Sequence, residues 1–441
     1  MTIHLESILQ RVDSWNLKDW LKHIQSLHSR SIDLELDRVR RVLHRLHWQA
    51  PSLVIVVAGT NGKGSTVAML EAIYRSAGYR VGAFTSPHLV SYCERVRLDK
   101  VAATETEICQ AFLQTEAARS GVPLTYFEFG TLAALWLLQR HRVDIALLEV
   151  GLGGRLDAVN VVNPDLAVIT AIAIDHQAWL GNTREAIGAE KAGIFRYRGR
   201  VVIGDSEPPR SISERSVRLC CDTRVSEVDY HLRPSGQGQW HWEADSNHWP
   251  DGGVSLALPG LPGGSIQRAN AACALAAVRL LQDRVPVADY CCWQGLQDVH
   301  LPGRQQVVAG SVERIFDVAH NTSAVIELAD TLRRKPVVGR TIAVFSILAD
   351  KELATILATM ADLISLWFIT RVDNDRATSL TTLAAALSRN GNCSWQSCPE
   401  PVSAYQRALG TAQPGDRIVV FGSFYLVGAI LAVLREDTAA A

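Results

Sequence analysis

A glycine-rich stretch with one lysine is the clearest candidate for chemistry in this sequence. Gly59-Thr60-Asn61-Gly62-Lys63-Gly64-Ser65 directly follows the apolar run Leu53–Ala58. Glycines let backbone N–H groups approach phosphates, a helix that begins there adds a favourable dipole, and Lys63 can reach the β- and γ-phosphate oxygens. We therefore expect this loop to bind a nucleoside triphosphate. Its candidate binding residues are Thr60, Asn61, Gly62, Lys63, Gly64 and Ser65.

The loop departs from the general phosphate-binding pattern G-x-x-x-x-G-K-[ST]. Val57 stands where the first glycine belongs, and Gly64 replaces the hydroxyl residue after the lysine. The alternative is a plain strand-to-helix turn that uses glycine for tight packing. The preceding strand and the order Gly-Lys-Gly-Ser-Thr favour phosphate binding.

Three further polar groups follow predicted strands, which is where ligands bind in open α/β sheets. Glu149 ends a strand and is either a Mg²⁺ ligand or a partner in a salt bridge. His176 suits a metal as a neutral imidazole, although a structural histidine is the commoner case. Ser86 either offers a hydroxyl to a metal or belongs to a simple Ser-Pro turn. The residues alone leave these alternatives open.

Two more segments carry groups that can take part in chemistry. Lys191, in Glu190-Lys191-Ala192-Gly193, is by itself typical of a lysine on a helix surface. Asp317-Val318-Ala319-His320-Asn321 follows the first strand of a second α/β series. It either places three polar groups at an interdomain face or forms a turn in which Asn321 or Thr322 caps a helix.

The elements that must position these residues alternate between strand and helix. This alternation predicts a doubly wound, mostly parallel α/β sheet of the phosphate-loop type. The first fifty residues are predicted to be helical. The predicted strands are 53–58, 80–85, 143–150, 165–170 and 200–203, and the predicted helices are 65–77, 132–140, 184–195 and 270–281.

Two changes in pattern divide the chain. Residues 205–265 are punctuated by proline and glycine, which predicts a small β-rich excursion. The sequence Leu301-Pro302-Gly303-Arg304 predicts a boundary between an ATP-binding domain, 1–302, and a smaller C-terminal α/β domain, 303–441. The smaller domain has predicted strands at 312–316, 341–346, 366–370 and 417–421, and predicted helices at 322–333, 352–360 and from residue 425.

Bulk composition excludes several classes of protein. The 441 residues are 48% hydrophobic and 20% charged with a formal net charge of -1, which argues against nucleic-acid or anionic-membrane binding. The first thirteen residues lack the long apolar stretch of a signal peptide, and the nine cysteines form no C-x-x-C pair. We therefore expect a cytoplasmic protein with reduced thiols.

Taken together, these segments resemble the folylpolyglutamate synthase family, above all its bacterial bifunctional dihydrofolate synthase/folylpolyglutamate synthases. The Mur ligases are wider relatives that share the fold and the chemistry. The resemblance runs from about residue 15 to residue 435. The segments that carry it are Gly59–Ser65, Ser86-Pro87-His88-Leu89, Thr125-Tyr126-Phe127-Glu128, 148–157, Asp175-His176, 190–195, 301–304 and 317–321. Thr322, where proline is frequent, and Gln305, where an apolar residue is usual, depart from the pattern.

The resemblance implies a role for each segment. It implies that ATP also contacts Asn270, Arg304 and Asp317, and that His320 lies close to the γ-phosphate. It implies two magnesium sites, held by Ser86, Glu149 and His176 and by a carbamylated Lys191. The implied catalytic residues are Lys63, Lys191 and His320. The implied pterin-binding residues are Ser31, Ile32, Asp33, Thr125, Tyr126, Phe127, Glu128, Leu156, Asp157 and Ala158.

The implied reaction is ATP-dependent amide ligation. L-Glutamate is joined to dihydropteroate and to reduced folates, and a monomer is expected. A Mur-type ligase acting on a nucleotide sugar is one alternative, for which about fifty residues before the first strand offer little room for a uridine-nucleotide domain. A GTPase-like switch is another, but the sequence has no guanine-reading Asn-Lys-x-Asp.

Overall fold

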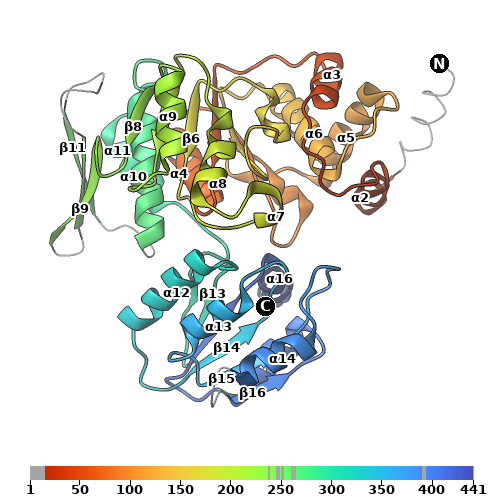
Figure 1. The fold of residues 1–441 in the computed structure, drawn as a ribbon, viewed down its shortest axis with the longest axis vertical. Coiled ribbons are helices and arrows are strands. Elements are labelled where there is room, and N and C mark those ends of the chain that lie inside the picture. The colour runs from red at the N-terminus through yellow and green to blue at the C-terminus, as the bar shows by residue number, and fades with distance from the viewer. Residues whose placement is uncertain are drawn as a thin grey trace.

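The computed structural model describes residues 15–236, 239–244, 249, 253–259, 265–389 and 394–440. It has two α/β lobes, each built around its own sheet (Figure 1). The larger lobe contains the phosphate loop, and the smaller lobe begins with strand β12 (Gln306–Val308). Residues 1–14, on which part of the predicted helical start and the signal-peptide argument depend, lie outside the described residues.

An eight-stranded sheet in the order β4-β3-β2-β5-β1-β6-β7-β8 forms the centre of the larger lobe. The strands from β2 to β8 in this order run parallel, and β3 and β4 are added antiparallel at one edge. The mostly parallel α/β sheet predicted from the sequence is therefore confirmed. The strands are β1 (Leu53–Ala58), β2 (Val81–Phe84), β3 (Val96–Leu98), β4 (Val101–Ala102), β5 (Ile145–Glu149), β6 (Leu166–Ile169), β7 (Arg200–Ile203) and β8 (Asp222–Val225).

Helices cover both faces of this sheet, which explains why its central strands are continuous apolar runs. In β1, Val54 and Val56 pack with one group of helices, whereas Ile55 and Val57 pack with the other. The first face is covered by α2 (Leu17–Ser26), α3 (Asp37–Arg45), α5 (Glu105–Arg119), α6 (Tyr126–Arg140), α7 (Gln177–Leu180), α8 (Arg184–Lys191) and α9 (Arg210–Arg218), and the second by α4 (Lys63–Ser76), α10 (Ser265–Leu280) and α11 (Asp289–Gln297).

The segment predicted as a β-rich excursion is only partly β-structure. It forms a three-stranded antiparallel sheet of β9 (Tyr230–Gly236), β10 (Gln239–Ala244) and β11 (Val254–Pro259). Residues 210–218, however, form helix α9, so the prediction was wrong there. Ile212 of α9 is buried in the core of the main sheet, and this helix therefore belongs to the α/β alternation. Several turn residues of the excursion lie outside the described residues.

The smaller lobe has a six-stranded sheet in the order β12-β13-β17-β14-β15-β16, parallel except for β12. Its four predicted strands are present as β13 (Glu313–Phe316), β14 (Thr341–Phe345), β15 (Leu366–Ile369) and β17 (Arg417–Phe421). β16 (Ser394–Ser397) was not predicted, because its residues are exposed and lack an apolar pattern. The helices are α12 (Thr322–Arg334), α13 (Leu353–Met360), α14 (Leu380–Arg389), α15 (Pro401–Thr411) and α16 (Phe424–Ala440).

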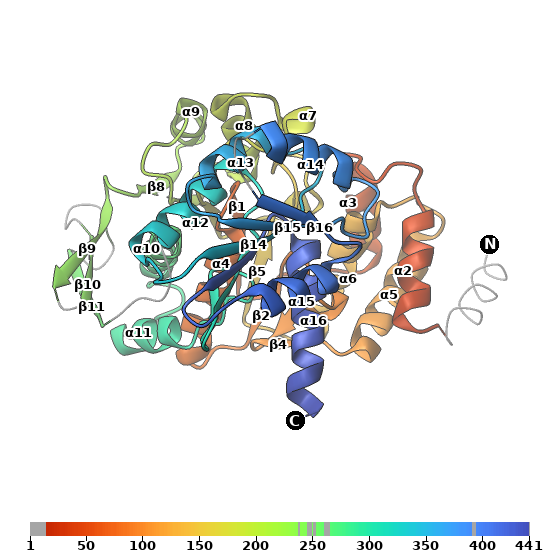
Figure 2. The same ribbon diagram turned by 90° about the horizontal axis from the view of Figure 1, so that it is seen from below.

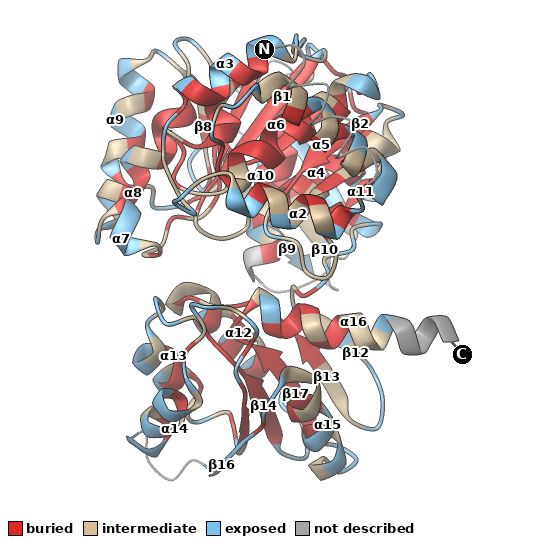
Figure 3. Cartoon of the chain, turned by 90° about the vertical axis from the view of Figure 1, so that its right-hand side faces the viewer, coloured by how far each residue is buried: buried red, intermediate tan, exposed pale blue. Residues whose placement is uncertain are grey.

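The two lobes touch along the carboxyl edge of the large sheet. Leu89 and Val90, which follow β2, pack against the core cluster that contains α16. Seen from below, the smaller lobe lies in front of the middle of the larger lobe (Figure 2). Figure 3 shows the central strands of both sheets buried, such as β1, β14 and β17, with exposed residues on the outer helices. Within the described residues, no helix is both long and apolar enough to cross a membrane.

Candidate active site

The phosphate loop joins β1 to α4 at the carboxyl end of the central strand. Lys63 is the first residue of α4, and its Nζ donates to the carbonyl oxygens of Gly59 and Thr60 at 3.0 and 3.2 Å. The Thr60 hydroxyl donates to the backbone oxygen of Ala173 at 3.0 Å, which ties the loop to the chain after β6. The amino end of a 14-residue helix and an ammonium group therefore face the same space. This arrangement suits an anionic ligand.

Gly62 holds the turn into α4 in a conformation that other residues rarely adopt. Its φ is +91°, and an added Cβ would overlap the side-chain oxygen of Asn270 on α10. We expect Gly62→Ala to lower kcat/KM for ATP roughly 100-fold, because a shifted loop misplaces Lys63. Steady-state kinetics with varied ATP will measure this. Gly78→Ala is the matched control for a positive φ, since Gly78 ends the same helix with open space around it; a similar loss in both variants would contradict the argument.

Neighbouring strands bring the other predicted residues to the same edge. β1, β2, β5 and β6 are parallel, so the residues that follow them lie together. Glu149, the last residue of β5, accepts a hydrogen bond from the backbone N–H of Ser86 at 3.0 Å. Burial raises the pKa of Glu149, whereas the charge of Lys63 lowers it. Glu149, Ser86 and Lys63 thus form one polar cluster.

His176 is half-buried and Lys191 is buried, and both lie near charged groups of this cluster. Burial lowers the pKa of His176 to about 4, so its imidazole is neutral at neutral pH and suited to metal binding. Lys191 ends α8, is 4% exposed and has its pKa lowered to about 7 by burial, with Lys63 acting in the same direction. The interpretation of Lys191 as a surface lysine is therefore wrong.

The residues present fit a nucleotide and a divalent cation. The Ser65 hydroxyl, in the first turn of α4, is buried without a hydrogen-bonding partner among the described residues, so it is available to bond to a ligand. The described residues contain no group of three His, Cys, Asp or Glu side chains that would hold a metal unaided.

The smaller lobe contributes polar groups directly opposite this cluster. Asp175 receives hydrogen bonds from Lys351 Nζ at 2.5 Å and from Asn321 Nδ2 at 3.1 Å. Asn321 and Asn61 of the phosphate loop exchange hydrogen bonds at 3.0 and 3.2 Å. Asn321 also caps α12, because its Oδ1 accepts from the Ala324 N–H. Both interpretations of the 317–321 segment therefore hold.

Lys351 is the interlobe residue that the sequence reasoning missed. Burial raises the pKa of Asp175, but the positive charges of Lys351 and of His176, which is protonated at the low pH where Asp175 titrates, outweigh burial and hold that pKa below its usual value. The two side chains are only 5% and 8% exposed, so the pair is screened little by water. The charged pair Asp350-Lys351 in the loop after β14 was a signal of the kind that identified the other strand-end residues.

We expect Lys351→Met to lower kcat roughly tenfold or more, because the buried Asp175 carboxylate loses its cationic partner and the lobes lose a contact. The measurement is kcat together with the midpoint of thermal unfolding. Arg333→Met is the control, since it removes an ion pair to Asp362 in the same lobe whose side chains are 44% and 64% exposed. Equal effects of the two substitutions would contradict a specific interlobe role.

The remaining predicted nucleotide residues also lie on the smaller-lobe side. The Arg304 guanidinium stacks over the Phe424 ring at 4.8 Å and attracts both Asp317 and Glu149. Asp317 accepts the N–H groups of Gln305 and Ala319, and burial raises its pKa to about 6. His320 Nδ1 lies 2.8 Å from the Val318 carbonyl oxygen, and burial lowers its pKa to about 4. His320 is therefore neutral at neutral pH.

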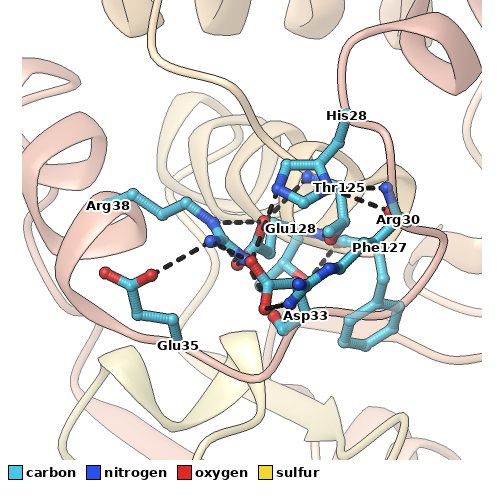
Figure 4. Close-up of polar contacts among 9 residues, drawn as sticks. His28, Arg30, Asp33, Glu35, Arg38, Thr125, Phe127 and Glu128 are labelled. Atoms are coloured by element: carbon cyan, nitrogen blue, oxygen red, sulfur yellow. Dashed lines mark hydrogen bonds and ion pairs between the residues drawn. The ribbon is translucent and has the colours of Figure 1, made fainter.

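Two of the three predicted pterin segments are held together by one arginine side chain. Asp33, in the same loop as Ser31 and Ile32, and Glu128 both bind one arginine (Figure 4). The Phe127 ring packs on Gly151, where an added Cβ would overlap it. Tyr126 and Leu156 are half-buried, and Ala158 is buried.

The Asp157 carboxylate is already engaged by the protein. Its two oxygens accept the N–H groups of Leu152 and Val159 at 2.8 and 2.9 Å. Burial raises its pKa to about 6, and these backbone hydrogen bonds act against that rise. The segment 156–158 is therefore held rigidly in place by its own aspartate.

Known proteins match both lobes. The Mur ligase middle domain matches residues 57–278, and the glutamate ligase domain of Mur ligases matches residues 303–424. The dihydrofolate synthase/folylpolyglutamate synthase of Escherichia coli is 39% identical over 95% of both chains. The E. coli FolC structure in complex with DHPP and ADP has a TM-score of 0.89 at 37% identity, covering 96% of this chain and 99% of that one. The bifunctional Yersinia pestis synthase complexed with AMPPNP and Mn ion has a TM-score of 0.86 at 40% identity, covering 96% and 98%.

Proposed function

The chain belongs to the dihydrofolate synthase/folylpolyglutamate synthases of the Mur ligase family, and we propose that it joins L-glutamate to dihydropteroate and to reduced folates with cleavage of ATP to ADP and phosphate. One observation in particular supports this proposal. Lys63, Glu149 and the Asp175-His176 pair meet at one sheet edge, and polar groups of the second lobe face them. An ATP-dependent ligase needs such a site, because ATP has to meet both substrates between the lobes.

The proposed reaction activates a carboxylate that is otherwise a poor electrophile. Its oxygen attacks the γ-phosphorus of ATP, the bond to the β-phosphate oxygen breaks, and ADP leaves with that electron pair. The glutamate amine then attacks the acyl phosphate, loses a proton, and displaces inorganic phosphate as the amide forms. For dihydropteroate the product is dihydrofolate, and for reduced folates the γ-carboxyl of the existing glutamate is extended.

The residues of this chain act in that reaction by positioning and by charge. Lys63 and the amino end of α4 hold the triphosphate, with Thr60, Asn61, Gly62, Gly64 and Ser65 forming the loop. Asn270, Arg304 and Asp317 are proposed to hold the rest of ATP, and neutral His320 to lie near the γ-phosphate. A bound Mg²⁺, held by Ser86, Glu149 and His176, would supply charge neutralisation at the phosphates.

Lys191 is proposed to carry a carbamate that helps to hold a second metal. Its neutral amine adds to CO₂, forms an N–C bond and releases one proton, which converts a cationic side chain into an anionic one. Support comes from its burial and from its pKa of about 7, because a neutral amine is required for the addition. The pterin is proposed to bind along Ser31–Asp33, Thr125–Glu128 and Leu156–Ala158.

We further propose that the ATP-binding domain spans 1–302 and the glutamate ligase domain 303–441. We also propose a monomer in the cytoplasm, and the net charge of -1 argues against nucleic-acid or anionic-membrane partners.

ADP formation with dihydropteroate or tetrahydrofolate as acceptor tests the proposed function. Omission of L-glutamate is the first control, and a UDP-linked sugar acid is the competing acceptor. The proposal expects glutamate-dependent ADP formation with at least one pterin and none with the UDP-sugar. No glutamate-dependent turnover with any pterin would refute it.

A further inference from the structure

One buried guanidinium binds two of the segments to which the proposed function assigns the pterin. Arg38 lies in the first turn of α3, and its side chain is 7% exposed. Its Nε donates to both carboxylate oxygens of Glu128 at 2.9 and 3.0 Å, and its Nη2 lies 2.8 Å from Oε1 of the same carboxylate. Figure 4 shows the Arg38 side chain between the loop and the start of α6.

The same guanidinium also holds the loop before α3. Arg38 Nη1 donates to Asp33 Oδ2 at 2.6 Å, and Nη2 donates to the Asp33 backbone oxygen at 2.8 Å. A weaker contact reaches the half-exposed Glu35 at 3.1 Å. All three nitrogens of the guanidinium therefore take part, and we call Arg38, Asp33 and Glu128 the Arg38 clamp.

Glu128 also fixes the start of α6 through hydrogen bonds to Thr125. Its Oε2 accepts the Thr125 N–H at 2.7 Å, while its own N–H donates to the Thr125 hydroxyl at 3.3 Å. Such a reciprocal pair fixes the first turn of a helix. Because Phe127 in that turn packs on Gly151, a shift of α6 would also move the chain that leads into the third pterin segment.

The charges of the Arg38 clamp make Arg38 hard to replace. Hydrogen bonding to Arg38 lowers the pKa of Asp33, so this carboxylate is ionised at neutral pH. Its other partners are the His28 imidazole at 3.4 Å and the Arg30 guanidinium at 3.7 Å, and the Arg30 side chain is 74% exposed. Without the guanidinium, the buried Glu128 would face Asp33 with no cation between them.

We infer that Arg38 is a positioning residue for the pterin substrate: it sets the 31–33 loop against the start of α6 so that both can contact one ring system. Lysine cannot replace it, because one ammonium group cannot satisfy the bidentate Glu128 contact and the two Asp33 contacts at once. This inference rests on the proposed function, and it extends the site to a residue outside the three pterin segments.

The test compares Arg38→Lys and Arg38→Met with the wild type. We expect the KM for dihydropteroate and that for tetrahydrofolate to rise about 10-fold in Arg38→Lys and about 100-fold in Arg38→Met. The KM for ATP should stay within about threefold, because the phosphate loop shares no contact with the Arg38 clamp. Glu35→Gln should change neither KM more than about twofold, since Glu35 is half-exposed.

Arg119→Lys and Arg119→Met are the matched controls. Arg119 binds Glu116 through two nitrogens, and the two side chains are 11% and 3% exposed. Arg119 also donates to the Val122 carbonyl oxygen, but neither Arg119 nor Glu116 bonds to any of the three pterin segments. Substitution of Arg119 should lower the midpoint of thermal unfolding without selectively raising the pterin KM. If Arg38→Met does not fold, Arg38→Lys alone provides the test: its pterin KM should rise while its ATP KM stays within about threefold of the wild type.

Two outcomes would overturn the inference while leaving the proposed function intact. In the first, the wild type turns over pterins, but Arg38→Lys has the same pterin KM values as the wild type. In the second, the KM for pterin and the KM for ATP rise equally in the Arg38 variants, or the pterin KM rises as much in the Arg119 variants. Either result would indicate a general structural role. A wild type without glutamate-dependent turnover would instead reject the proposed function itself.

Discussion

Replacing Lys63 with alanine is expected to lower glutamate-dependent ADP formation roughly 1000-fold. The Lys63 ammonium is the cation that α4 presents directly at the loop, and it lies among the charges of Glu149, Asp175 and Asp157. Charge develops on the γ-phosphoryl oxygens as the acyl phosphate forms, and removal of this cation leaves that charge uncompensated. The measurement is kcat with saturating pterin and glutamate.

The Lys63 experiment needs a control for loss of a lysine as such. Lys18→Ala removes a similar side chain from an exposed position on α2 and should leave kcat unchanged. Unaltered thermal unfolding of Lys63→Ala would show that the loop still folds. A wild-type rate in Lys63→Ala would contradict the phosphate-loop assignment.

The second large effect is expected for Lys191. Lys191→Ala should lower kcat roughly 100- to 1000-fold, because the variant cannot form the carbamate proposed to hold a second metal. Lys191→Arg should be equally inactive, since it keeps a cation but cannot be carbamylated. Short carboxylates such as acetate should partly restore the alanine variant by supplying the missing anion.

The pKa of Lys191 predicts a dependence on pH and on CO₂. Because burial lowers that pKa to about 7, the amine is increasingly neutral above pH 7 and protonated below it. The fraction able to react with CO₂ therefore falls as the pH drops through 7, and carbamylation should fall with it. After incubation with ¹³C-bicarbonate, NMR should show a carbamate carbon in the wild type and none in Lys191→Arg. Wild-type rates in Lys191→Ala would show instead that the carbamate is unnecessary.

The positions of Lys63, Glu149 and His176 were predictable because each residue lies at or just after the end of a strand, and each of these strands is an apolar run in the sequence. Parallel strands in one sheet bring their carboxyl ends together, so residues far apart in sequence can be grouped from local patterns alone. The same reasoning placed Asp317 and His320 at the equivalent edge of the second sheet. Their assignment to one family required the longer motifs around them.

Arg38 and Lys351 could not be predicted in this way. Their partners lie 90 and 176 residues away, and each contact depends on how two separate elements pack. The burial of Lys191 could not be predicted either, since the lysine ends a helix whose own sequence shows an ordinary polar pattern. Local periodicity describes one face of one helix, and it does not say which other element covers that face.

Some errors were avoidable, because the local signals were present. Thr125-Tyr126-Phe127-Glu128 has capping-box spacing before an apolar run, which marks the start of α6 at Tyr126 instead of residue 132. Thr104 and Glu107 form the same device at the start of α5, a helix that was not predicted. α9 was missed because glycine and proline nearby suggested β-structure for the whole 205–265 segment.

The path of one oxygen atom tests the central claim most directly. Dihydropteroate labelled with ¹⁸O in its carboxylate is incubated with the enzyme, ATP, Mg²⁺ and L-glutamate, and the released phosphate and the pterin product are analysed by mass spectrometry. We expect dihydrofolate as the product and one ¹⁸O atom per phosphate released, because the carboxylate oxygen that attacks ATP leaves with the phosphoryl group. Unlabelled phosphate accompanying dihydrofolate would contradict the acyl phosphate, and phosphate release without a glutamate-containing product would contradict the ligase itself.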